Sequence, residues 1–85
     1  MIITNGQSDY LSLREGYNKV FVFFASGASG TLTPNSSVRS GELIPETLPN
    51  GDTTITGSTS FAIMGPGLLS FNSAGVTGTI TAEVG

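Results

Sequence analysis

The chain has 85 residues, no cysteine and no histidine, and its 3 Lys+Arg stand against 6 Asp+Glu for a net charge of −3. This length allows one domain with a small core. The composition excludes disulfides, thiolate or imidazole metal sites and a histidine-based catalytic triad. It also argues against binding to nucleic acid or to an anionic membrane, because both need clustered positive charge.

The predicted surface is polar but carries little charge. Charged residues make up 11% of the chain, against about 25% in typical domains, and Ser, Thr, Gly and Asn fill the difference. Residues 1–6 lack the basic start and apolar length of a signal peptide, and no stretch approaches the roughly 20 apolar residues of a membrane span. We therefore expect synthesis in the cytoplasm without an export signal.

The chain opens with two short predicted strands. Residues 1–4 fit a short edge strand, and the Asn5-Gly6 pair is typical of a tight turn. In residues 8–13, polar side chains alternate with Leu11 and Leu13, which predicts that both leucines point inward. Glu15 and Gly16 are then expected to separate this strand from the next one.

The strongest strand signal is in residues 17–25. Its residues 20–24 are all apolar, which predicts a central strand that is buried on both sides. Strand alternation places Phe21 and Phe23 on the face opposite to Val20 and Val22.

The rest of the chain continues in the same pattern. Two prolines make residues 41–52 an edge or a crossing connection with little regular structure. Further strands are expected at residues 53–57, 60–64, 68–72 and 76–84, with a sharp end at residues 65–67 and a turn at residues 73–75. Ile55, Phe61 and Ile63 are the expected inward residues of the first two.

This pattern predicts an all-β fold. The expected architecture is one domain over residues 1–85, a small antiparallel β-sandwich of seven or eight short strands with Greek-key or jelly-roll-like connections, and a closed barrel is the alternative. Residues 1–6 would be an edge strand or a short N-terminal arm.

Catalytic and metal-binding patterns are scarce. Glu42 and Glu46 are the closest acidic pair, but Pro45 lies between them, so a helix that presents both on one face is not expected. There is also no clustered Asp-x-Asp loop of the kind that binds calcium. We therefore expect neither enzymatic activity nor a cofactor.

Phe21 and Phe23 are the candidate interface residues. In a small sandwich the outer face of a strand meets water, so two phenylalanines there need a cover. One interpretation is that residues 41–52 provide it through Leu43, Ile44 and Leu48. The other is a subunit interface, because a slender core without disulfides favours a homo-oligomer.

Residues 54–83, which read TITGSTSFAIMGPGLLSFNSAGVTGTITAE, consist of Thr-, Ser- and Gly-rich strands punctuated by turns. This segment resembles the small β-sandwich virion proteins of tailed bacteriophages, including capsid decoration (cement) proteins, and the likeness extends over residues 20–84. The resemblance implies a protein on the outer surface of the phage head, commonly a homotrimer, that clamps neighbouring major capsid protein subunits. It also implies docking through a terminal arm, for which Met1, Ile2 and Ile3 are the candidates.

A receptor- or glycan-binding module of a phage fibre or spike is the alternative function. Loops at residues 26–30 and 41–52 offer places for adaptable recognition. Only Tyr10 and Tyr17 could present a ring with a polar tip for sugar stacking, which favours the capsid interpretation.

Overall fold

The computed structural model describes residues 1–37, 44–45 and 47–85. These residues contain six strands and no helix, so the predicted all-β class is confirmed. The strands are β1 (Gly6–Gln7), β2 (Leu11–Phe24), β3 (Ser29–Ser37), β4 (Ile44–Pro45), β5 (Thr59–Thr77) and β6 (Ile80–Val84). In the part of the chain that the structure describes, no helix could span a membrane.

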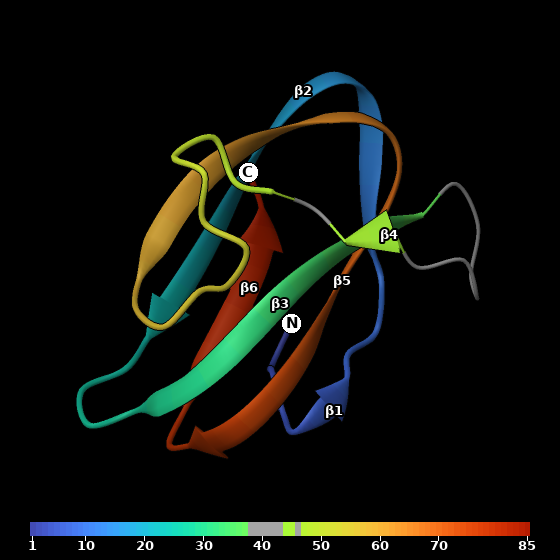
Figure 1. Ribbon diagram of the computed structural model, residues 1–85. Helices are drawn as coiled ribbons and strands as arrows, with labels where there is room; N and C mark the ends of the chain where they lie inside the picture. Colours follow the sequence, from blue (N-terminus) through green and yellow to red (C-terminus); the bar gives the residue numbers. More distant parts are fainter. Residues whose placement is uncertain (38–43, 46) are drawn as a thin grey trace.

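All six strands belong to one open antiparallel sheet with the order β4-β3-β5-β2-β6, and β1 pairs separately with β5. The two long strands, β2 with 14 residues and β5 with 19, form its backbone. The first half of β5 pairs with β2, whereas its second half pairs with β3 and β1. Figure 1 shows β2 and β5 arching together over the top of the molecule.

The sheet curls around a single core. Buried and exposed residues alternate over residues 18–23 of β2, which is the period expected when one face of a strand is covered, whereas β5 buries three residues in a row, Leu69, Ser70 and Phe71. The buried apolar residues come from residues 1–5, from β2, β3, β5 and β6, and from residues 47–57: Ile3, Leu13, Val20, Val22, Leu32, Leu48, Ile55, Phe61, Leu69, Phe71, Ile80 and Ala82. A flat sheet could not bring these residues into one cluster, so the inner face must be concave.

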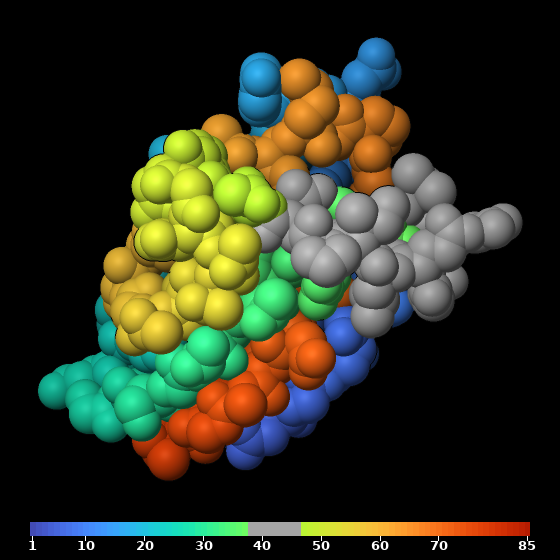
Figure 2. Space-filling model, viewed as in Figure 1, coloured from blue at the N-terminus to red at the C-terminus, as the bar shows by residue number. Residues whose placement is uncertain are grey.

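Residues 47–57 lie across the open side of the curled sheet. The Ile55 N–H donates to the Leu32 carbonyl at 2.7 Å and the Leu32 N–H donates to the Ile55 carbonyl at 2.9 Å, which ties this segment to β3. Leu48 is buried in the core. A turn follows it, in which the Leu48 N–H donates to the Asp52 carbonyl. Figure 2 shows the segment in yellow, between the start of β5 and β3.

The count of seven or eight short strands is not confirmed, because several expected breaks fall inside long strands. β2 continues through Glu15 and Gly16 with one extra residue between its pairs Leu13–Gly67 and Gly16–Gly65. β5 continues through residues 65–67, where Gly67 adopts a φ of 153°, and through residues 73–75. Glycines therefore bend these strands where the sequence led us to expect their ends.

The inward residues agree better with expectation. Leu13, Ile55 and Phe61 are buried, and Leu11 and Ile63 are half-buried and pack against the core. The expectation that β2 is buried on both sides is wrong, because the side chains of Phe21 and Phe23 remain exposed. β2 is nevertheless central, since β5 and β6 flank it.

Candidate functional site

One outer face of the sheet carries an unusual group of side chains. Among the described residues, five large apolar side chains are 45% to 74% exposed: Ile2, Tyr17, Phe21, Phe23 and Met64. Isolated exposed apolar residues are normal on protein surfaces, but a group on one face needs an explanation.

The strand register places all five on the same face. Residues directly opposite each other in an antiparallel pair point to the same side of a sheet. Ile2 is opposite Thr81, and Thr81 is opposite Phe23. Tyr17 is opposite Met64, and Tyr17, Phe21 and Phe23 are separated by even numbers of residues along β2. We call these five residues the outer apolar face.

Phe21 and Phe23 therefore lie on the face opposite to Val20 and Val22, as strand alternation predicted. The described part of residues 41–52 does not cover them, since Leu48 packs in the core on the inner side of the sheet. The expected contributions of Leu43 and of the Ile44 side chain lie outside the described residues. The ring of Phe21 lies against Gly85, where an added Cβ would be 2.6 Å from Phe21 Cε2.

Met1, Ile2 and Ile3 line the outer edge of β6. The Ile3 N–H donates to the Ile80 carbonyl at 2.8 Å, and the Ala82 N–H donates to the Met1 carbonyl at 2.9 Å. Ile3 is 1% exposed and belongs to the core, whereas Ile2 is on the outer apolar face. A docking arm made of these residues would have to break both hydrogen bonds, and their docking role stays a prediction.

The sequence identified only part of the outer apolar face. Tyr17 could have been assigned to this face from the sequence, because an even number of residues separates it from Phe21 and Phe23 along the strand. Met64 and Ile2 could not, since their positions depend on the register of β5 and of residues 1–3 against the other strands.

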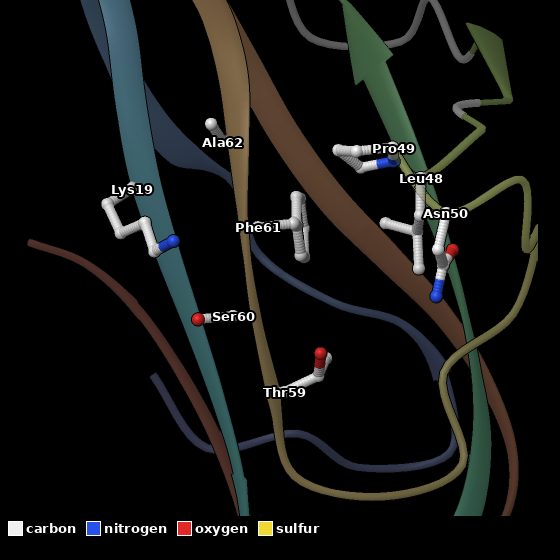
Figure 3. Close-up of a pocket in the computed structure, with 8 residues that line it drawn as sticks. All are labelled: Lys19, Leu48, Pro49, Asn50, Thr59, Ser60, Phe61 and Ala62. Atoms are coloured by element: carbon white, nitrogen blue, oxygen red, sulfur yellow. The ribbon is translucent and has the colours of Figure 1, made fainter.

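A groove runs beside the first half of β5. It consists of two adjoining hollows of about 330 Å³ and about 170 Å³, which share Leu48, Pro49, Phe61 and Ala62 as lining residues. Figure 3 shows Phe61 and Thr59 pointing from β5 into the larger hollow, with Leu48, Pro49 and Asn50 on the opposite wall. No tyrosine lines either hollow, so the groove lacks an aromatic platform with a polar tip for a sugar.

Metal-binding side chains are not gathered in the described part of the chain. No three His, Cys, Asp or Glu side chains lie together there in a way that could hold a metal ion. Glu42 and Glu46 are outside the described residues. Lys19 is exposed on the outer side of β2 and lines the larger hollow of the groove.

Comparison of the chain with protein-family models, with curated proteins and with solved structures finds no match. The outer apolar face and the groove are therefore the two surfaces from which a function can be inferred.

Proposed function

We propose that this chain is a non-enzymatic structural protein that associates with further copies of itself through the outer apolar face. The observation that carries the proposal is the position of five large apolar side chains on one face of the sheet. They come from residues 1–3, which pair with the outer edge of β6, from β2 and from β5. Covering such a patch removes apolar area from water, which is the main favourable term in protein association.

We propose a second copy of the chain as the molecule that covers the outer apolar face, because a small domain gains stability when it buries apolar surface against an identical subunit. A domain of 85 residues buries only about 60–65% of the surface of its unfolded chain. No disulfide contributes, because the chain has no cysteine. Pairing of identical apolar faces would extend the core across a subunit boundary, as in many homo-oligomers.

Within this proposal, the assembly is a capsid decoration protein. It binds as a homotrimer to the outer surface of a tailed-phage head and stabilises contacts between major capsid protein subunits. The resemblance of residues 54–83 to such proteins supports this role, as does the low charge of the chain. The curled sheet would then be a reduced form of their sandwich, with β6, β2 and the first half of β5 as one layer.

The mechanism would be mass action. A protein that binds only the assembled shell shifts the assembly equilibrium toward that shell. Three linked copies would multiply weak individual contacts into strong attachment, because the second and third contacts form within one complex.

Self-association is tested by light scattering on the purified protein at micromolar concentration. We expect an oligomer, with a trimer as the favoured mass, and a monomer after the double substitution Phe21→Ser and Phe23→Ser. Ala74→Ser, at an exposed position on the second half of β5, is the control and should leave the mass unchanged. A monomeric parent protein, or a double variant that stays oligomeric, would contradict the proposed face.

The capsid step has a separate test. The oligomer is mixed with emptied heads of the phage that encodes the chain, and co-sedimentation is measured. Binding of the parent protein with weaker binding of the monomeric double variant supports trivalent attachment. Absence of binding would remove the capsid role and leave self-association standing.

A further inference from the structure

Within the described residues, the first half of β5 has a strand partner on one side only. Residues 59–64 pair with β2, while β3 pairs only with residues 68–77 of β5. Among the described residues, no backbone hydrogen bond joins residues 47–57 to residues 59–64. An unpaired strand edge of this kind is a template for an added strand.

The backbone groups that face this open edge can be assigned. The Gly85 N–H donates to the Lys19 carbonyl, so the backbone polar groups of Lys19 point toward β6. Backbone groups alternate in direction along a strand, so those of Val20 point toward β5 and meet Phe61. Phe61 therefore faces β2, and the N–H and C=O groups of Ser60, Ala62 and Met64 face the open edge.

The groove described above lies along this edge. Its inner wall is apolar, because Phe61 and Ile63 lie on one side and Leu48 and Pro49 on the other. An added strand would alternate its side chains between the groove and the outer side of the sheet. Its inward positions therefore fit apolar side chains.

The charge of the groove specifies the partner further. Among the described residues that line the two hollows, Lys19 is the only charged one, although the chain as a whole has a net charge of −3. The Lys19 side chain is on the outer side of the sheet, next to Ala62, its cross-strand neighbour. A carboxylate at an outward position of the added strand would be the complementary group.

We propose that residues 59–64 of β5 bind an extended segment of a partner protein as an added strand. The segment hydrogen-bonds to Ser60, Ala62 and Met64, places apolar side chains against Phe61 and Leu48, and presents a carboxylate to Lys19. This inference goes beyond the proposed self-association, because it uses the strand edge and the groove. It shares only Met64 with the outer apolar face, and there it uses the backbone and not the side chain.

The test uses an acetylated peptide of about eight residues, in which valine alternates with threonine and one central threonine is replaced by glutamate. Backbone amide chemical shifts and hydrogen exchange are followed by NMR during titration. We expect protection of the Ser60, Ala62 and Met64 amides, whereas the amides of Phe61 and Ile63 are protected already in the free protein. A matched peptide with lysine in place of glutamate should bind roughly tenfold more weakly.

Two substitutions at Ala62 separate backbone pairing from side-chain contact. Ala62→Pro removes an N–H that faces the open edge but no hydrogen bond to β2, and it should weaken peptide binding by roughly tenfold or more. Ala62→Ser keeps the N–H and should bind like the parent protein. Lys19→Glu provides a test that does not depend on proline, since it should reverse the preference between the two peptides.

Three results would overturn the proposal. The first is equal binding of the glutamate and lysine peptides together with unchanged binding to the Lys19→Glu variant. The second is a set of shifts confined to Tyr17, Phe21 and Phe23. The third is that the parent protein does not bind the peptide while Ala62→Pro loses self-association. That result would mean that the edge of β5 pairs with a second copy of the chain. The monomeric Phe21→Ser and Phe23→Ser variant should still bind the peptide, so failure of one proposal is distinguishable from failure of the other.

Discussion

The side chain of Asn18 pairs with the backbone of Arg14 as a strand would. The Arg14 N–H donates to Asn18 Oδ1 at 3.0 Å, and Asn18 Nδ2 donates to the Arg14 carbonyl at 2.9 Å. Asn18 Nδ2 also lies 3.1 Å from the Gly16 carbonyl and 3.4 Å from the Ile63 carbonyl. Because Asn18 is 2% exposed, its amide supplies these backbone groups with partners where β2 departs from regular pairing.

Asn18→Ala should therefore lower the free energy of unfolding by about 2–3 kcal/mol, since it leaves buried backbone groups without partners. Urea denaturation measures the change. Asn18→Asp keeps the acceptor for the Arg14 N–H but directs a carboxylate at the Arg14 and Gly16 carbonyls, so it should be no less destabilising. A loss below about 0.5 kcal/mol for the alanine variant would show that water replaces the amide.

Gly65 is required by the same contact. A Cβ at this position would overlap the Arg14 carbonyl oxygen and would lie 3.0 Å from Asn18 Nδ2. Gly65→Ala should cost about 1–3 kcal/mol, because the overlap involves backbone that cannot move freely. Gly57→Ala is the matched control, since a Cβ there meets nothing within 4 Å, and it should be neutral or stabilise by up to about 1 kcal/mol. Equal thermal unfolding of the two variants would contradict the assigned contact.

Local pattern predicted the two faces of β2 but not the length of the strands. The alternation of Val20 and Val22 with Phe21 and Phe23 is a property of any extended segment, so it could be read without knowing the partners of β2. Whether a strand ends at Gly16 or at Gly67, or continues through it, depends on contacts made across the sheet. Asn18 bridges the irregularity in β2, and nothing in the local sequence distinguishes such a bridge from an ordinary turn.

The candidate surfaces show the same division. Phe21 and Phe23 follow from strand parity, whereas Met64 joins them only because β5 pairs with β2 in one particular register. The open edge of β5 was not predicted at all, because the sequence assigned residues 60–64 to an ordinary strand. Edge status is a property of the whole sheet, which emerges only when the partners of every strand are known.

Phe71 and Phe23 offer a test of which side of the sheet is the core. Phe71 is fully buried, whereas Phe23 is 58% exposed. Phe71→Leu should cost about 1–2 kcal/mol in a tightly packed interior, and Phe23→Leu should stay within about 0.5 kcal/mol. The free energies of unfolding are compared at a concentration where the parent protein is monomeric, because association would add to the apparent effect at Phe23. A larger loss of unfolding free energy for Phe23→Leu than for Phe71→Leu would contradict the assignment of the core to the face that carries Phe71.

Two serines of β5 differ in how their buried hydroxyls are satisfied. Ser70 is 0% exposed, and its Oγ accepts a hydrogen bond of 2.7 Å from Gln7 Nε2. Ser73 is 5% exposed, and among the described residues its Oγ has no hydrogen-bond partner. A buried hydroxyl without a partner has lost its hydrogen bonds to water and has formed no hydrogen bond within the protein, so its burial lowers stability.

Ser73→Ala should therefore leave the free energy of unfolding unchanged or raise it by up to about 1 kcal/mol, while Ser70→Ala should lower it by about 1 kcal/mol. The two substitutions remove the same atom from the same strand, so the difference isolates the hydrogen bond. Gln7→Ala is the control, because a Ser70→Ala effect that comes from this bond should largely vanish in a Gln7→Ala background. If Ser73→Ala destabilises as much as Ser70→Ala, Ser73 has a partner in solution, and its hydroxyl contributes to the stability of the core.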